Sequence, residues 1–232
     1  QLGDKAISYG FCEDFDYSAV DLHEGSDGTR LTVLKKGQFF CNLHLPLPGK
    51  HVVLNSLASL ALCDSLGIDK EHLVKGLESF QGVQRRFEKV ANYKGVEIYD
   101  DYAHHPSEVL ATLQAAQQLM SDKKGKLVVC FQPHRYSRLQ HLMDEFAASF
   151  DNADFLYLMP VYAAGEAPIA GVDHWGLYRN LNLGAGKVSV LESASIEECR
   201  ELILAELKPG DVLLTMGAGD ITRMGREIVA DK

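Results

Sequence analysis

The hydrophobic positions of this chain change their rhythm towards the middle. From Glu88 onward, short and nearly continuous apolar runs alternate with amphipathic stretches in which apolar residues recur every three or four positions. The runs predict strands, and the amphipathic stretches predict helices, as follows: strands at 95–100, 126–131, 154–159, 187–191 and 211–216, helices at about 106–121, 136–149, 195–207 and 219–231. Apolar strands separated by helices are typical of a parallel sheet that is covered on both faces. We therefore predict an open α/β domain whose ligands bind beyond the carboxyl ends of the strands.

The N-terminal third has a different pattern. Two alternating runs within residues 29–45 predict a β-hairpin. A helix is predicted up to about Leu66, where Gly67 suits a left-handed cap, and a second helix follows with Asp69 as its N-cap. The segment QGVQRRF at 81–87 fits neither pattern, so we place a domain boundary there.

Composition and charge exclude some classes of function. The net charge of −9 over 232 residues argues against a non-specific nucleic-acid binder or a protein that binds anionic membranes. The five cysteines are widely spaced and form no CxxC pair, which indicates reduced thiols in a cytoplasmic protein. No apolar stretch approaches the roughly 18 residues of a membrane span, so we expect no membrane insertion.

Polar and glycine-rich segments follow four of the predicted strands. They are Asp100, Asp101, His104 and His105 after the first strand, QPHRYSR at 132–138 after the second, YAAGE at 162–166 after the third, and GAGD at 217–220 after the last. Each segment alone also fits an ordinary capped or solvated loop, because Asp and Gly are common turn formers. Four of them on one predicted sheet edge favour a functional site.

The stretch IYDDYAHHPSEV at 98–109 crowds ionisable side chains before a helix. Pro106 suits the first helical position, which places His105 at the helix start, among free N–H donors that favour anions and a neutral imidazole. Asp100 and Asp101 could accept hydrogen bonds from ribose hydroxyls or from a histidine. A metal site is the alternative, although Asp-x-x-His lacks a third ligand.

Two further groups of side chains are candidates for binding anions or nucleotides. In HRYSRL, Arg135 and Arg138 are spaced to share one face at a helix start, and guanidinium groups bind carboxylates and phosphates bidentately. The acidic background of the chain and the preceding His134 favour an anionic ligand over a solvated basic turn. His51 and Asn55 belong to a polar stripe of period four, which fits either a ligand or solvent.

Arg85 and Arg86 lie in the segment between the two patterns. They either neutralise a bound phosphate or pair with some of the chain's many carboxylates.

Taken in order, several segments resemble the Mur ligases of peptidoglycan synthesis. They are YGFCED, PGKHVVLNSLAS, FQGVQRRF, DDYAHHPSEV, FQPHRYSRL, VYAAGEAPIAG and MGAGDI, which together cover essentially the whole chain. The resemblance implies three domains in the full protein. Residues 1–82 would be the C-terminal portion of the central P-loop ATP-binding domain, 83–87 a hinge, and 88–232 a Rossmann-like domain that binds the incoming amino acid.

The resemblance also implies a reaction. Within the family it points to ligases that join L-alanine to the carboxylate of UDP-N-acetylmuramate through an acyl phosphate, converting ATP to ADP and phosphate. No G-x-x-x-x-G-K-[ST] occurs in the chain, so we expect a fragment that is inactive alone. ATP and Mg²⁺ are the implied cofactors, with the Mg²⁺ ligands mostly upstream of this fragment. The sequence leaves the oligomeric state open.

Residue roles on the nucleotide side follow from the same resemblance. It implies that His51 and Asn55 contact adenine, that Arg86 meets the phosphates and takes part in catalysis, and that Asp101 holds the ribose. One position departs from the family, because Val52 stands where an asparagine usually follows the histidine.

On the amino-acid side, the resemblance implies that His104 and His105 are catalytic residues facing the reacting centre. Arg135 and Arg138, assisted by His134, would bind the alanine carboxylate or a nearby phosphate.

Two alternatives stay open. A related ligase that reattaches recovered murein tripeptide to UDP-muramate shares the DD-x-A-H-H-P style of motif, although we do not expect FQPHRYSR in it. The other is a non-catalytic nucleotide-binding module.

Overall fold

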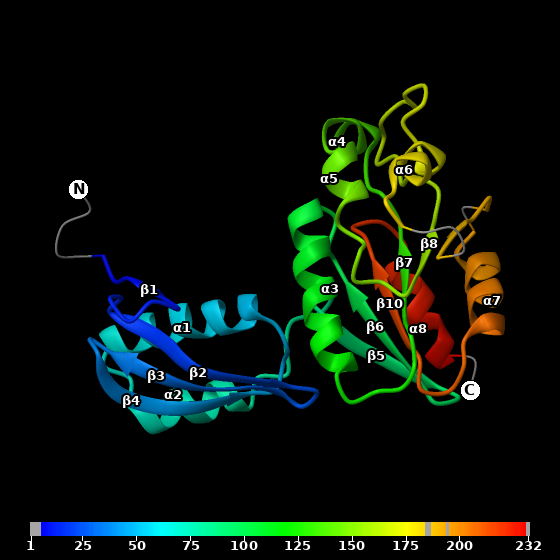
Figure 1. The fold of residues 1–232 in the computed structure, drawn as a ribbon. Coiled ribbons are helices and arrows are strands. Elements are labelled where there is room, and N and C mark those ends of the chain that lie inside the picture. Colours follow the sequence, from blue (N-terminus) through cyan, green and yellow to red (C-terminus); the bar gives the residue numbers. More distant parts are fainter. Residues whose placement is uncertain (1–5, 184–186, 194, 231–232) are drawn as a thin grey trace. The chain divides into compact units, whose positions relative to one another are not determined.

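The computed structural model describes residues 6–183, 187–193 and 195–230. The chain separates into two compact units, Gln1–Gln81 and Gly82–Lys232 (Figure 1). In the part of the chain that is described, no helix is long and apolar enough to span a bilayer.

The N-terminal unit contains a four-stranded sheet in the order β1-β2-β3-β4. Its strands are β1 (Tyr9–Gly10), β2 (Tyr17–Gly25), β3 (Gly28–Lys35) and β4 (Gln38–Leu45). β1 pairs with β2 in parallel, and the other pairs are antiparallel. The predicted hairpin within 29–45 is confirmed as β3–β4, and its turn residues Lys36 and Gly37 both have positive φ.

Two helices, α1 (Lys50–Ser65) and α2 (Lys70–Glu78), complete this unit. The predicted caps are confirmed: Gly67 follows α1 with a φ of 79°, and the side chain of Asp69 accepts a hydrogen bond from the Glu71 amide at 2.8 Å. Apolar residues of α1 pack with β2, β3 and β4 in one core, in which the fully buried members include Leu57, Leu60 and Val33.

The C-terminal unit is built on a six-stranded sheet in the order β5-β6-β10-β7-β8-β9. Its strands are β5 (Glu88–Tyr93), β6 (Val96–Asp101), β7 (Leu127–Phe131), β8 (Phe155–Leu158), β9 (Val188–Val190) and β10 (Val212–Met216). All pairs are parallel except β5 with β6, which confirms the predicted open α/β fold. β5 is an edge strand that the sequence pattern did not predict.

Helices cover both faces of this sheet (Figure 1). They are α3 (Pro106–Met120), α4 (Tyr136–His141), α5 (Met143–Ala147), α6 (His174–Asn180), α7 (Ile196–Glu206) and α8 (Thr222–Ala230). Side chains of β7 alternate between the two faces: Val129 and Phe131 lie in the core with α3 to α6, whereas Val128 and Cys130 lie in the core with α7 and α8.

Two of the predicted helices needed correction, and one helix was missed. The helix expected at 136–149 is interrupted at Leu142, whose φ of −125° ends α4 before α5 begins. The last helix begins at Thr222 instead of 219, because the preceding residues form a loop in which the Ile221 amide donates to Gln132 Oε1 at 3.3 Å. The short helix α6 was not predicted.

Candidate functional site

Four loops meet at the carboxyl edge of the C-terminal sheet. The strand order places the ends of β6, β10, β7 and β8 side by side, so the segments that follow them become neighbours. Backbone hydrogen bonds join them: the Gly217 amide donates to the Asp101 carbonyl at 3.2 Å, and the Tyr162 amide donates to the Pro133 carbonyl at 2.8 Å. The strand order thus brings the four polar segments together.

Asp101 lies inside the loop that follows β6. Its side chain is only 4% exposed, and its two oxygens accept the backbone amides of Phe87 and Ala103, each at 2.7 Å. Burial raises the pKa of Asp101, although these two hydrogen bonds act in the opposite direction. This carboxyl group shapes the loop. The ribose contact stays a prediction, and it would need a second lone pair on an oxygen that already accepts an amide.

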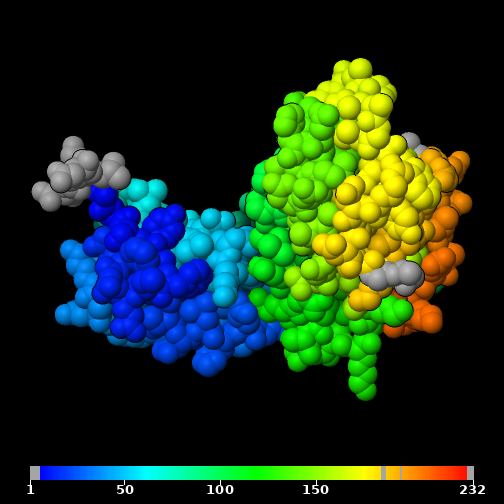
Figure 2. Space-filling model, turned by 45° about the horizontal axis from the view of Figure 1, so that its top comes forward, coloured from blue at the N-terminus to red at the C-terminus, as the bar shows by residue number. Residues whose placement is uncertain are grey.

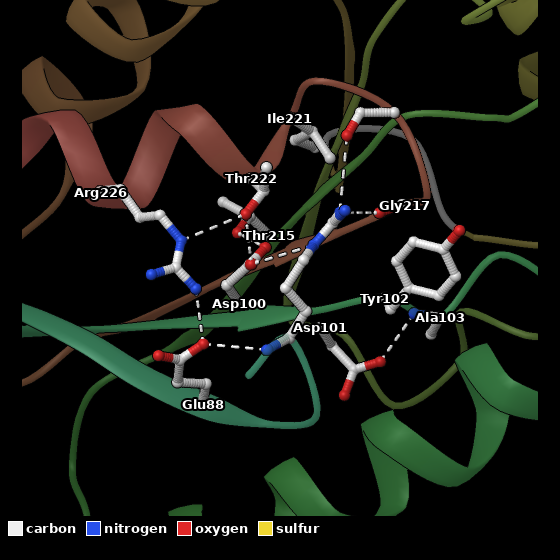
Figure 3. A network of polar contacts seen from close by, with 12 residues as sticks. Glu88, Asp100, Asp101, Tyr102, Ala103, Thr215, Gly217, Ile221, Thr222 and Arg226 are labelled. Carbon is white, nitrogen blue, oxygen red and sulfur yellow. Dashed lines mark hydrogen bonds and ion pairs between the residues drawn. The ribbon is translucent and has the colours of Figure 1, made fainter. Parts of the chain in front are cut away.

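Asp100 is fully buried and belongs to a polar network behind the edge (Figure 3). Its carboxylate accepts hydrogen bonds from the hydroxyls of Thr215 at 3.1 Å and Thr222 at 2.6 Å. The network continues through Arg226, which donates to Thr222 at 3.4 Å and to Glu88 at 2.6 Å. Asp100 therefore supports the edge and is not itself available to a ligand.

Arg85 ties the start of this unit to the glycine loop after β10. Its guanidinium donates to the carbonyls of Gly217 at 2.5 Å and Gly219 at 3.5 Å, lies 4.7 Å from the ring centre of Tyr102, and has Nε 3.4 Å from Asp100. Two roles were considered for Arg85 and Arg86, neutralising a bound phosphate or pairing with a carboxylate of the chain. Arg85 has the second role.

Arg86 differs from its neighbour. Its side chain is 55% exposed, and its ion pair with Glu108 is long, at 3.9 Å. An exposed guanidinium with so weak a partner retains donors for an anionic ligand such as a phosphate.

The start of α3 confirms the predicted positions of Pro106 and His105. Pro106 is the first helical residue, and His105 is the N-cap, whose Nδ1 accepts the Ser107 amide at 3.4 Å. Glu108 closes a capping box by accepting the amides of His104 at 3.0 Å and His105 at 3.2 Å. Burial raises the pKa of Glu108, but these hydrogen bonds outweigh it and leave the pKa below its usual value. The helix start therefore already holds a carboxylate of its own.

Histidine rings from two loops come together beside this helix start. His104 Nδ1 lies 2.8 Å from the Tyr102 carbonyl and 3.3 Å from Glu108 Oε2, so Nδ1 carries a proton, and Nε2 has a lone pair whenever the ring is neutral. The ring centres of His104 and His134 are 6.1 Å apart, and His134 stacks on Tyr162 at 5.5 Å. Burial, and then the charge of Arg138, lower the pKa of His134, which keeps that ring neutral near pH 7.

The two arginines after β7 do not share a helical face as predicted. Arg135 precedes α4 with a left-handed φ of 70°, and its amide donates to the Tyr162 carbonyl at 2.9 Å. Arg138 lies within α4, with Nη1 at 3.3 Å from His134 Nδ1. The prediction was wrong because it assumed helical backbone at Arg135. Both guanidinium groups nevertheless belong to the same sheet edge as His104.

Some residues that organise the site were not predicted. Gln132 joins two loops, because its amide nitrogen donates to Asp220 at 2.8 Å while its oxygen accepts the Ile221 amide. A Cβ on Gly219 would lie 2.4 Å from this oxygen and 2.8 Å from Tyr162 Cγ, so the loop requires glycine there. The GxG spacing was the one signal in the sequence for this close packing.

In the N-terminal unit, His51 and Asn55 lie one turn apart on α1, and both side chains are exposed. Their spacing of four places them on the same face of the helix. Val52, beside them, is partly buried against the core of this unit. The nucleotide contacts of His51 and Asn55 stay predictions.

Each of the two units matches a known protein family. The model of the Mur ligase middle domain matches residues 2–63, and that of the Mur ligase glutamate ligase domain matches residues 85–219. The structure is similar to UDP-N-acetylmuramate-alanine ligase MurC from Thermotoga maritima, with a TM-score of 0.80 and 31% identity, covering 99% of this chain and 48% of that protein.

Two other ligases share the fold at lower identity. MurF from Thermotoga maritima in complex with ADP has a TM-score of 0.67 and 20% identity, covering 97% of this chain and 47% of MurF. A murein peptide ligase from Psychrobacter arcticus has a TM-score of 0.61 and 22% identity, covering 96% and 45%. The chain thus spans about half the length of each of these proteins. With a domain model matched across most of its C-terminal unit and a second one in its N-terminal unit, the chain belongs to the Mur ligase family.

Proposed function

We propose that this chain is the C-terminal part of a cytoplasmic, ATP-dependent ligase that joins L-alanine to the carboxylate of UDP-N-acetylmuramate. The reaction forms an acyl phosphate, which the amine of alanine attacks, and it releases ADP and phosphate. The likeness to the MurC enzyme, at 31% identity over 99% of this chain, supports this choice among the ligases. In this proposal residues 1–82 complete the central ATP-binding domain, 83–87 form the hinge, and 88–232 bind the amino acid.

The observation that carries the proposal is the group of two histidines and two arginines at the sheet edge. Arg138, with a guanidinium fork and no ion pair among the described residues, suits the alanine carboxylate. The amine must lose a proton before it attacks, and the free Nε2 of His104 can accept a hydrogen bond from it. Such groups act by holding the two reactants in line and by stabilising developing charge.

The nucleotide side of the proposal depends on fewer contacts. Arg86, exposed and weakly paired, would meet the phosphates of ATP, while His51 and Asn55 would contact adenine. Within the described ranges, no three His, Cys, Asp or Glu side chains are placed to hold a metal ion. These residues do not form a Mg²⁺ site by themselves, so we assign the Mg²⁺ ligands to the rest of the full protein.

The test is phosphate release by the full-length protein, supplied with ATP, Mg²⁺ and UDP-N-acetylmuramate. Alanine and murein tripeptide are added in separate reactions. Release that depends on alanine supports the proposal. Release with the tripeptide alone would assign the protein to the recycling ligases. Release with neither, although ATP binds, would favour a non-catalytic nucleotide-binding module.

A further inference from the structure

We propose that Glu166 is a positioning residue that orients Arg138 and divides the work of the two arginines. In this arrangement Glu166 holds the first turn of α4, while Arg138 binds the carboxylate of the incoming amino acid. The inference rests on the proposed function of the same site, which it extends by a residue and by an assignment of roles.

Both oxygens of the Glu166 carboxylate bind Ser137 in the first turn of α4. Oε1 accepts the hydroxyl of Ser137 at 2.6 Å, and Oε2 accepts the Ser137 amide at 3.0 Å. A tight turn presents Glu166 in this direction: Ala164 and Gly165 have positive φ, and the Glu166 amide donates to the Ala163 carbonyl at 3.0 Å. Two hydrogen bonds to an ionised group fix both the position and the rotation of the helical turn.

A second attachment lies at the other end of the same segment. His134 and Tyr162 form a β-bridge, and the Arg135 amide donates to the Tyr162 carbonyl. The loop after β8 therefore holds the loop after β7 at two points, one before α4 and one in its first turn. In the space-filling view, the light-green and yellow-green parts of the C-terminal unit adjoin on the surface (Figure 2). Because Arg138 lies one residue beyond the second attachment in the same short helix, the direction of its Cα–Cβ bond follows from the orientation of the turn at Ser137.

The charges around the two arginines are unequal. Hydrogen bonds from Ser137 lower the pKa of Glu166, with the nearby charge of Arg135 acting in the same direction, so Glu166 is a permanent anion at neutral pH. Arg138 faces the neutral ring of His134, and within the described part of the chain it forms no ion pair. A substrate carboxylate near Arg135 would meet the negative charge of Glu166. Near Arg138 it would meet a guanidinium whose side-chain hydrogen-bond partner is the neutral imidazole of His134.

The test uses the full-length enzyme and measures KM separately for alanine, ATP and UDP-N-acetylmuramate. We expect Glu166→Ala to raise the KM for alanine about tenfold or more, equivalent to about 1.4 kcal/mol. The KM values for the other two substrates should change less than about twofold. Glu166→Gln should restore part of the loss, because its amide oxygen still accepts one hydrogen bond from Ser137. The matched control is Glu145→Ala, an exposed carboxylate on α5.

Three further variants keep the inference testable if Glu166→Ala does not fold. Ser137→Ala removes one hydrogen bond and leaves the charge of Glu166, and we expect about a threefold rise in the KM for alanine. Arg138→Gln should raise that KM at least about tenfold more than Arg135→Gln. Equal effects of the two arginine substitutions would overturn the division of roles.

The remaining outcomes are distinct. An active wild type with an unchanged KM for alanine in Glu166→Ala refutes this inference and leaves the proposed function intact. A rise shared equally by all three KM values, or a loss of thermal stability without a selective rise for alanine, also refutes it. A wild type that releases no phosphate with alanine refutes the proposed function first.

Discussion

Replacing Asp100 by alanine is the strongest test of how the sheet edge is held. The carboxylate is fully buried and accepts the hydroxyls of Thr215 and Thr222, while Arg85 Nε lies 3.4 Å away. Removing one partner of a buried charged pair costs about 3–5 kcal/mol, because the other polar groups lose their partner in a place that water does not reach. Thr215 has a second acceptor in the Tyr99 carbonyl at 3.2 Å, which reduces the cost. We therefore expect about 3 kcal/mol of lost stability for Asp100→Ala, at the low end of that range.

The isosteric Asp100→Asn should lose less, about 1–2 kcal/mol, because its amide still accepts one hydroxyl but lacks the charge. Urea unfolding of the 232-residue chain measures both values, and hydrogen exchange at the Thr215 amide shows whether β10 opens. Asp144→Ala, an exposed aspartate on α5, is the control and should change stability by less than about 0.5 kcal/mol. A loss of under about 1 kcal/mol in Asp100→Ala would refute the view that this network supports the edge.

Three further predictions concern the loops and the helix start. Gly219→Ala places a Cβ 2.8 Å from Tyr162 Cγ, so we expect about 1–3 kcal/mol of destabilisation and a displaced tyrosine ring; an unchanged Tm and crystal structure would contradict this. The hydrogen-bonded Glu108 has a lowered pKa, so its stabilising effect is present above its ordinary value of 4.5 and is lost as pH falls through the folded value. The stability difference between wild type and Glu108→Gln should therefore shrink in acid, and a difference that stays constant with pH would argue against the ionised cap. In the full-length enzyme, Arg138→Ala should weaken the apparent affinity for alanine far more than that for UDP-N-acetylmuramate, and equal losses would remove its assigned role.

The strands and helices that were predicted correctly share strong local signals. β6, β7, β8 and β10 are apolar runs, and α3 begins with a histidine cap and a proline, so each could be assigned from a few neighbouring residues. β5 was missed because EKVANY is an edge strand that is only partly buried, which leaves no continuous apolar run. The short α6 lacks the length for a visible period, although Asp173 caps it.

The location of the site could be predicted, but its internal partners could not. The alternation of strands and helices predicts parallel strands whose carboxyl ends share one edge, and the strand order seen in the structure then makes the polar loops neighbours. The partners are joined by long-range contacts: Arg85 and Gly217 are 132 positions apart, and Ser137 and Glu166 are 29 apart. Residue type gave no preference between Arg85 and Arg86, or between Asp100 and Asp101, because these neighbours are chemically identical. Only the fold distinguishes the members of each pair: Arg85 is less exposed than Arg86, and the two buried aspartates bind different partners.

The two adjacent aspartates show how this distinction arises. Successive side chains of a strand point to opposite faces, so Asp100 enters the side of the sheet covered by α8, where Thr222 lies, whereas Asp101 enters the side of Phe87. Asp100 thus binds Thr215 and Thr222, which flank the glycine loop, and Asp101 binds the Phe87 amide at the start of the unit. Of the carboxylates in this stretch, Glu108 is the one that contacts His104, by accepting its amide at 3.0 Å and lying 3.3 Å from its Nδ1, while the centre of the His104 ring lies 6.1 Å from that of His134. The crowding of charge in DDYAHHPSE therefore mainly holds the loop after β6 and the start of α3, and a Glu108→Ala variant should move the His104 ring more than variants of Asp100 do.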